Sequence, residues 1–327
     1  MSNNEHILKV QGLRTYFRTV EGIAKAVDDV SFHASAGETL GIVGESGSGK
    51  SVSALSIMRL IQNPPGKVVE GRIEFNGTNL LDLSEREMHK IRGNRISMIF
   101  QEPMTSLNPV YTVGNQIAEM FQVHQGLTRK KSHERAIDML ARVKMPSPEK
   151  RVREHPFQLS GGMRQRVMIA MSLACNPEIL IADEPTTALD VTIQAQILEL
   201  ILELKEQYNA AVLMITHDLG VIAEIAQRVI VMYAGKVVEE GPTQSLFDDP
   251  KHPYTRGLLK SIPVLGLRAK YGRDRLTEIP GIVPSLYELP RGCIFQPRCQ
   301  ESMPECTQIL PELKSQGQGR KVRCHLY

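Results

Sequence analysis

The stretch Gly44-Glu45-Ser46-Gly47-Ser48-Gly49-Lys50-Ser51 follows the apolar run Thr39–Val43 and precedes the helix-like segment Val52–Ile61. It matches the pattern G-x-x-x-x-G-K-[ST], whose glycines let successive backbone N–H groups face one anion. The helix that follows directs its positive end at the same anion. Lys50 is then placed to reach the outer phosphates, and Ser51 to hold Mg²⁺. The stretch therefore predicts a binding site for a nucleoside triphosphate.

Composition sets only broad limits on the rest of the chain. The 327 residues are 42% hydrophobic, which is enough for a substantial core in one large domain or two. Lys and Arg number 39 against 36 Asp and Glu, a surplus too small to predict a nucleic-acid partner. Met1–Gln11 does not read as a signal peptide, and charges interrupt the most apolar stretch, Ala210–Ala234. We expect a cytosolic, globular protein.

Strand-like and helix-like segments alternate along most of the chain, which is typical of a parallel α/β sheet. Apolar residues turn to helical spacing between Pro103 and Pro156, and this indicates a helical insert between sheet segments. Beyond Gly241 the periodicity fades and proline recurs, so we expect a loop-like tail and a boundary near residue 245. The predicted strands are Ile7–Leu13, Ala26–Phe32, Thr39–Val43, Gly71–Phe75, Ile96–Phe100, Ile179–Ala182, Ala211–Thr216 and Arg228–Tyr233.

Two further motifs carry chemistry that fits a phosphate loop. Leu159–Arg166 contains Ser160-Gly161-Gly162 at the start of a helix-like segment, which makes a second anion-binding helix N-terminus. An apolar strand then ends in the paired acids Asp183 and Glu184. Carboxylates at a strand end beside a phosphate loop coordinate Mg²⁺ and orient the attacking water. We assign Asp183 to the metal and Glu184 to the water.

The order of these motifs resembles that of ABC-transporter ATPases over residues 7 to 245. The resemblance implies a P-loop NTPase fold with a RecA-like core and a helical subdomain at about residues 103–165. Gln101, in Ile99-Phe100-Gln101-Glu102-Pro103, is similar to the glutamine that contacts Mg²⁺ and water in this family. Asp190, in Ala188-Leu189-Asp190, resembles the D-loop aspartate, and His217 matches the histidine that touches the terminal phosphate.

The same resemblance implies that ATP is hydrolysed between its β and γ phosphates. A single cassette of this family does not close its own site, so Ser160, Gly161 and Gly162 of a second cassette are expected to complete the site at Gly44–Ser51. Adenine is expected to stack on an aromatic residue upstream of the loop. Tyr16 and Phe17 are both candidates, and counting from Leu13 favours Phe17, although either ring can instead belong to sheet packing.

The tail, residues 246–327, is similar to that of ATPases of oligopeptide and dipeptide importers. His252–Leu259, Ile279–Pro284 and Gly292–Cys299 carry this resemblance. It implies two membrane permease subunits, a related second ATPase chain, an indirect periplasmic peptide-binding protein, and a peripheral position on the cytoplasmic face of a bacterial inner membrane. An importer of nickel or another small solute, and a soluble ABC ATPase without a transport role, are the alternatives.

Cysteines gather in this tail, at Cys293, Cys299, Cys306 and Cys324, whereas Cys175 stands apart. A reducing cytosol disfavours disulfides, so we expect the four thiols to bind a metal. Their spacing, C-x5-C-x6-C-x17-C, lacks the close pairs that are usual for structural zinc. We therefore predict that the four cysteines bind a [4Fe-4S] cluster, with zinc or unligated thiols as alternatives.

Overall fold

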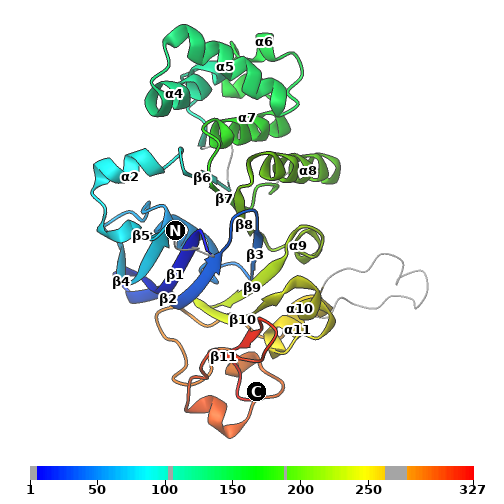
Figure 1. Ribbon diagram of the computed structural model, residues 1–327. Coiled ribbons are helices and arrows are strands. Elements are labelled where there is room, and N and C mark those ends of the chain that lie inside the picture. The colour runs from blue at the N-terminus through cyan, green and yellow to red at the C-terminus, as the bar shows by residue number, and fades with distance from the viewer. Residues whose placement is uncertain (1–5, 102–105, 188–189, 262–277) are drawn as a thin grey trace, which may run out of the picture. The chain divides into compact units, whose positions relative to one another are not determined.

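The computed structural model describes residues 6–101, 106–187, 190–261 and 278–327. These residues form two compact units, which we treat separately. One unit consists mainly of Asn76–Met214 together with Ala34–Glu38. The other consists of Leu8–His33, Thr39–Phe75 and Ile215–Tyr327, and it contains both the phosphate loop and the tail (Figure 1).

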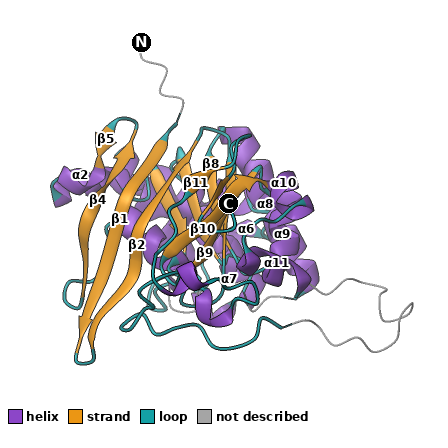
Figure 2. Ribbon diagram, turned by 90° about the horizontal axis from the view of Figure 1, so that it is seen from below, coloured by secondary structure: helices purple, strands orange, loops and turns teal. Residues whose placement is uncertain are grey.

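The unit that contains the phosphate loop has two sets of neighbouring strands. β2 (Gly22–Ala34), β1 (Leu8–Thr19) and β4 (Gly66–Phe75) lie side by side in this order, and β1 pairs antiparallel with β4 (Figure 2). β3 (Thr39–Val43) pairs parallel with β9 (Arg228–Tyr233), and β9 pairs antiparallel with β10 (Lys236–Pro242). Every residue of β3 is buried, as expected of a parallel strand with both faces covered. The sequence predicted the bounds of β3 and β9 as the structure has them.

Helices of this unit begin where the sequence offers a cap or a turn. α1 (Lys50–Ile57) follows Gly49, whose φ of 99° lies in the left-handed region that suits glycine. The Asp218 carboxylate accepts from the N–H groups of Gly220 and Val221 and so caps α9 (Leu219–Ile225).

The tail is more regular than its proline-rich sequence predicts. It contains the end of α10 (Thr243–Asp248), all of α11 (Pro253–Lys260), and the short strands β11 (Lys314–Ser315) and β12 (Lys321–Val322). β12 pairs with β10, so the last residues extend the strand set that holds the phosphate loop. The tail and the phosphate loop thus belong to the same compact unit. The domain boundary expected near residue 245 stays a prediction.

The other unit combines strands with the predicted helical insert. β6 (Ile96–Ile99) pairs parallel with β7 (Ile179–Asp183), and β8 (Ala211–Ile215) belongs mostly to the same unit. The insert consists of α4 (Val113–Gln125), α5 (Arg129–Arg142) and α6 (Pro148–Arg151), and α7 (Gly161–Leu173) packs against α4 and α5 (Figure 1). This unit also contains β5 (Thr78–Asn79), α2 (Glu85–Ile91) and α8 (Val191–Tyr208).

Helix ends in the insert follow local sequence signals. The Thr112 hydroxyl accepts from the N–H of Asn115 at the start of α4, and Gly126 ends this helix in a left-handed conformation. Within the described ranges, none of the helices has both the length and the apolar character needed to cross a lipid bilayer.

Candidate nucleotide site

Two of the three glycines of the phosphate loop, Gly44 and Gly49, lie where a larger residue would force neighbouring backbone to move. Gly44 has a φ of 152°, and a Cβ at this position would lie 2.2 Å from the carbonyl oxygen of Met232. At Gly49, a Cβ would lie 2.4 Å from the carbonyl oxygen of Ala26. The turn at Gly47 also has a positive φ, but it faces open space. Neighbouring backbone thus fits closely around both ends of the loop.

Lys50 bridges the two ends of the phosphate loop. Its ammonium group donates to the carbonyl oxygens of Gly44 at 2.7 Å and Glu45 at 3.0 Å. The backbone on the far side is fixed as well, because the N–H of Gly235 donates to the carbonyl of Ser48 at 3.0 Å. Lys50 and Ser48 are buried, Glu45 and Ser51 are half-buried, and Ser46 and Gly47 are exposed. The Lys50 ammonium group is therefore buried inside the loop and held by its first two carbonyl oxygens.

The predicted water-orienting acid, Glu184, follows the strand end of β7. Asp183 is buried as the last residue of this strand, and Glu184 has a φ of 46°, which turns the chain sharply. The side-chain amide of Gln101 donates to the Glu184 carboxylate at 3.0 Å, and the Thr187 hydroxyl donates to the same oxygen at 2.9 Å. The structure therefore places two of the three predicted catalytic side chains in contact, at the carboxyl ends of β6 and β7.

The Ser160-Gly161-Gly162 motif opens α7. Ser160 is the exposed N-cap, and its hydroxyl accepts from the N–H of Met163 at 3.4 Å. Gly162 lies so close to α8 that an added Cβ would approach a methyl group of Ile193 at 2.9 Å. The turn formed by these residues is therefore held against α8 and leaves Ser160 and Gly161 exposed.

Asp190 begins α8, and its carboxylate accepts from the N–H of Ile193 at 3.0 Å. The carboxylate therefore acts as an N-cap in addition to any role toward a nucleotide. The other two residues of the predicted D-loop, Ala188 and Leu189, lie outside the described residues, as do Glu102 and Pro103 of the segment after Gln101.

His217 follows β8 as an exposed residue. Its neighbours are ordered by local hydrogen bonds, because the N–H of Asp218 donates to the Thr216 hydroxyl at 3.0 Å. The N–H of Thr216 in turn donates to the carbonyl of Ile42, in the strand before the phosphate loop, at 3.4 Å. The backbone before His217 is thereby tied to β3.

The two candidate adenine platforms have different surroundings on β1. The Tyr16 hydroxyl donates to the Asp28 carboxylate at 2.7 Å, and the Lys25 ammonium lies 5.9 Å from the centre of its ring. Burial, followed by the bond to Asp28, raises the pKa of Tyr16 to about 12. Phe17 packs close to Gly66, where an added Cβ would lie 2.6 Å from the phenyl ring. Both rings are half-buried, so the choice between them stays open.

The four tail cysteines share one neighbourhood. The N–H of Cys293 donates to the carbonyl of Cys306 at 2.8 Å. Burial, together with smaller contributions from the nearby thiols of Cys306, Cys324 and Cys299, raises the pKa of Cys293 to about 11. Burial also raises the pKa values of Cys299 and Cys324. Across the part of the chain that the structure describes, however, no three His, Cys, Asp or Glu side chains are grouped as ligands of one metal ion.

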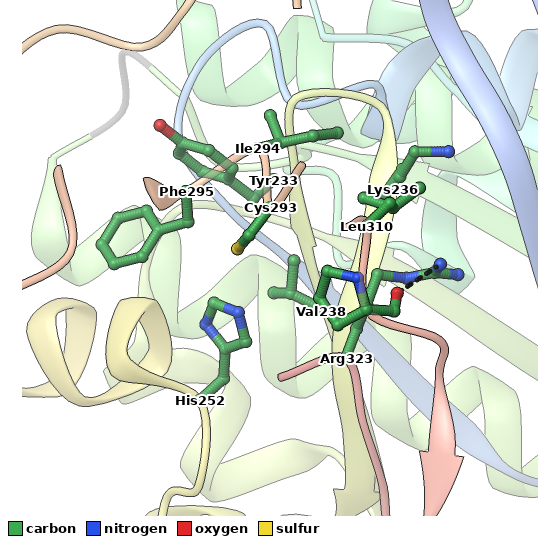
Figure 3. Close-up of a pocket in the computed structure, with 10 residues that line it drawn as sticks. Tyr233, Lys236, Val238, His252, Cys293, Ile294, Phe295, Leu310 and Arg323 are labelled. Carbon is green, nitrogen blue, oxygen red and sulfur yellow. Dashed lines mark hydrogen bonds between the residues drawn. The ribbon is translucent and has the colours of Figure 1, made fainter. Parts of the chain in front are cut away.

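A small pocket adjoins this cysteine-bearing segment (Figure 3). The sulfur of Cys293 points into it, and His252, Phe295 and Tyr233 lie around it. The space open to the centre of a water molecule is about 10 Å³, which is room for about one water and too little for a nucleotide. The pocket belongs to the packing of the tail and not to the phosphate site.

Sequence reasoning missed two side chains that contact the phosphate loop. Arg298 forms an ion pair with Glu45, and the Tyr254 hydroxyl accepts from the N–H of Glu45. An arginine and a tyrosine in a proline-rich tail carry no pattern of their own, and the contact between Arg298 and Glu45 joins residues 253 positions apart. Sequence spacing gives no signal for such a pair.

Known proteins match the chain over nearly its whole length. Residues 27–187 match the family described as ABC transporter, and residues 238–306 match the oligopeptide/dipeptide transporter C-terminal region. A probable peptide ABC transporter ATP-binding protein of Sinorhizobium fredii is 54% identical over 97% of this chain and 94% of its own length. The oligopeptide transport ATP-binding protein AppD of Bacillus subtilis is 52% identical over 98% of this chain and 97% of its own length. The dipeptide transport ATP-binding protein DppD of Escherichia coli is 50% identical over 98% of this chain and 96% of its own length.

Solved structures agree with the sequence comparisons. The ATP-binding cassette MJ0796, in a dimeric post-hydrolysis state bound to ADP and Pi, superposes with a TM-score of 0.65 at 31% identity. It covers 72% of this chain, and the match includes 98% of the cassette. The predicted P-loop NTPase fold is thus confirmed, and the chain belongs to the ATP-binding cassette proteins of ABC transporters, in the group that carries the oligopeptide/dipeptide transporter C-terminal region.

Proposed function

We propose that the chain is the ATP-hydrolysing subunit of a bacterial ABC importer for dipeptides or oligopeptides. The observation that carries the proposal is the geometry of Gly44–Ser51, where buried Lys50 closes a glycine loop between a buried strand and a helix N-terminus. The relatives named for peptide and dipeptide transport support peptides over nickel or another small solute. They also support a transport role over that of a soluble ABC ATPase.

Catalysis in this proposal rests on positioning and charge neutralisation, without a covalent intermediate. The loop N–H groups and Lys50 bind the β and γ phosphates of ATP, and Tyr16 or Phe17 stacks on the adenine. Gln101 and Thr187 hold the Glu184 carboxylate, which orients the attacking water and receives its proton. His217 contacts the terminal phosphate.

Mg²⁺ would be held by the Ser51 hydroxyl, the Asp183 carboxylate and the Gln101 amide oxygen. These are hard oxygen ligands of the kind that Mg²⁺ prefers, so the donor set fits the ion. When bound, the ion neutralises charge on the phosphate oxygens.

A second cassette would complete the site. Ser160, Gly161 and Asp190 are exposed, as residues that face a partner's nucleotide must be, and Gly162 lies half-buried beside them. The dimeric state of the related cassette MJ0796 supports this arrangement. We propose that the partner is a related chain, and that the pair binds two membrane permease subunits on the cytoplasmic face of the inner membrane. A periplasmic peptide-binding protein would deliver the solute, and nucleic acid has no role.

Substitution Glu184→Gln separates binding from turnover. The amide keeps the size of the side chain but cannot accept the proton, so we expect ATP to bind with little change while hydrolysis falls at least about 100-fold. Thr187→Val is a second variant, which removes one hydrogen bond to Glu184 and should lower turnover less. Full ATPase activity of the Glu184→Gln protein would contradict the assignment.

For the tail we propose a [4Fe-4S] cluster held by Cys293, Cys299, Cys306 and Cys324. The proposal is supported by the chemistry of four thiols in one compact unit, where Cys299, Cys306 and Cys324 lie near enough to Cys293 to affect its pKa. Burial raises the pKa values of Cys293, Cys299 and Cys324, so a bound cation would be needed to keep these three thiols as thiolates near neutral pH. A zinc ion bound tetrahedrally by all four thiolates, at Zn–S distances of about 2.3 Å, would require each sulfur to lie about 3.8 Å from the others.

Anaerobic purification followed by metal and sulfide analysis tests this proposal. We expect iron and acid-labile sulfide together with a visible absorption band, and loss of all three in Cys299→Ser. Zinc without sulfide, or protein free of both metals, would contradict the cluster.

A further inference from the structure

Glu45, the second residue of the phosphate loop, is held by the tail through both its backbone and its side chain. The N–H of Glu45 donates to the Tyr254 hydroxyl at 2.8 Å. The Arg298 guanidinium pairs with both carboxylate oxygens of Glu45, at 2.7 Å and 3.1 Å. All three residues lie in the same compact unit. The tail thus contacts the loop directly, with the two-pronged geometry that makes an arginine–carboxylate pair specific.

Arg298 is fixed before it reaches Glu45. Its side chain is only 4% exposed, and its remaining N–H groups donate to the carbonyls of Pro280 at 3.0 Å and Ile279 at 3.2 Å. The guanidinium also lies 5.8 Å from the centre of the Tyr233 ring. Because these contacts fix the fork, little side-chain freedom is lost when it binds a carboxylate. Arg298 is thus a preorganised support and not a mobile surface charge.

Tyr254 is equally fixed. It is fully buried on α11, and its ring packs against Tyr233 and Phe295 with centroids 4.6 Å and 5.4 Å away. The N-cap of this helix is His252, whose ring nitrogen accepts from the N–H of Tyr254 at 3.1 Å. The hydroxyl that meets the loop is therefore set by the packing of the tail.

A carboxylate at the second position of a phosphate loop opposes the binding of a polyanion. Glu45 is half-buried, so water screens its charge only in part. Arg298 cancels this charge and, together with Tyr254, sets the direction of the first N–H after Gly44. Both effects favour an anion in the loop.

We propose that Arg298 and Tyr254 are positioning residues for nucleotide binding, through which the cysteine-bearing tail sets the affinity of the phosphate loop for ATP. The proposal rests on the proposed role of Gly44–Ser51 as the phosphate site. In this proposal each residue acts through its contact with Glu45. A cassette with a loosened tail then binds ATP weakly although its own loop sequence is intact.

The test is the dissociation constant of ATP for the full chain and for a set of variants. Arg298→Met removes the charge and keeps the length of the side chain. Because this variant leaves the Glu45 carboxylate unpaired beside the phosphate loop, we expect affinity to fall about tenfold. Glu45→Gln in the Arg298→Met background removes the repulsion and should restore most of the affinity. The ATP affinity of Arg298→Lys should lie between those of wild type and Arg298→Met, because lysine keeps the positive charge but lacks the two-pronged guanidinium.

Two further variants separate positioning from general stability. Tyr254→Phe keeps the ring in its cluster and removes only the acceptor for Glu45, so the dissociation constant should rise a few-fold. Arg256→Met is the matched control, because Arg256 pairs with Glu301 at 2.9 Å elsewhere in the same unit. It should leave ATP affinity unchanged. Circular dichroism and thermal melts establish that each variant is folded.

The outcomes distinguish this inference from the function on which it rests. If wild-type protein fails to bind ATP, or if Lys50→Ala binds as well as wild type, the phosphate site itself is wrong. If Lys50→Ala loses binding while folded Arg298→Met binds like wild type, only the role of the tail is overturned. The same holds if Arg298→Met loses affinity and Glu45→Gln does not restore it.

Discussion

Substitution Glu239→Gln should destabilise the protein far more than a typical loss of a charge. Glu239, on β10, is fully buried, and its carboxylate accepts from the N–H groups of Lys251 and His252, both at 2.9 Å. The guanidinium of Arg320, itself 9% exposed, lies 3.2 Å away. The glutamine amide turns an N–H₂ group toward one of these three donors. One buried donor then lacks its acceptor, and Arg320 loses its nearest buried counter-charge.

The expected loss follows from these contacts. Breaking a buried ion pair by removing one charge costs about 3–5 kcal/mol, and an orphaned buried N–H accounts for about 1–3 kcal/mol of that. Arg320 keeps a contact to Asp249 at 3.3 Å, which favours the lower end. With roughly 2 °C of melting temperature per kcal/mol in a chain of this size, we expect a fall of about 6 °C or more.

A thermal melt followed by circular dichroism measures this shift. Glu203→Gln is the matched control, because Glu203 pairs with Lys144 at 2.9 Å but the two side chains are 48% and 52% exposed. Such a pair contributes about 1 kcal/mol at most, so this variant should melt within about 2 °C of wild type. Equal shifts for the two variants would refute the claim that the buried pair anchors the tail.

Two further predictions concern pH and the loop. Burial lowers the pKa of His252 to about 3, so folded protein keeps this ring neutral while unfolded protein takes up a proton below about pH 6.5. Stability from this group is complete above about pH 6.5 and falls as pH decreases toward about 3, by about 2 kcal/mol at about pH 5. Melts at about pH 7 and about pH 5 should differ less for His252→Asn, which keeps a cap for α11; an unchanged difference would contradict the assignment. In the loop, Gly44→Ala should lower ATP affinity at least about tenfold, because its Cβ would meet the Met232 carbonyl at 2.2 Å. Gly47→Ala adds only backbone strain of about 1–2 kcal/mol, and equal affinities in titrations of the two variants would count against the loop geometry.

The sequence predicted the parts of the fold whose signal is local. Thr39–Val43 and Arg228–Tyr233 are mostly apolar because strands that pair in parallel are buried on both faces, and the structure has them at these bounds. Glycine, lysine and serine at fixed spacing likewise define the phosphate loop wherever they occur. Gln101 and Glu184 follow strands whose carboxyl ends meet at one edge of the sheet. That the two side chains lie near each other could therefore be predicted from the sequence, but the distance between them could not.

The tail was predicted poorly for a physical reason. Its order comes from buried charged pairs and hydrogen bonds, such as Glu239 with Arg320, and not from an apolar period. A buried glutamate looks the same in sequence as a solvated one, so the sequence of β10 did not indicate that Glu239 pairs with Arg320. The helices α10 and α11 are short, and the prolines around them suggested loops. Contacts between distant residues, such as Arg298 with Glu45, required the structure.

Peptide-dependent ATP hydrolysis by the assembled transporter tests the central claim most directly. The chain is purified from bacterial membranes with the proteins bound to it, the partners are identified by mass spectrometry, and the complex is reconstituted in lipid with its peptide-binding protein. We predict two membrane permease subunits, a second ATP-binding chain, and ATP hydrolysis that rises when dipeptides or oligopeptides are added and disappears in Glu184→Gln. Purification without membrane subunits, or hydrolysis that responds to nickel and not to peptides, would contradict the account.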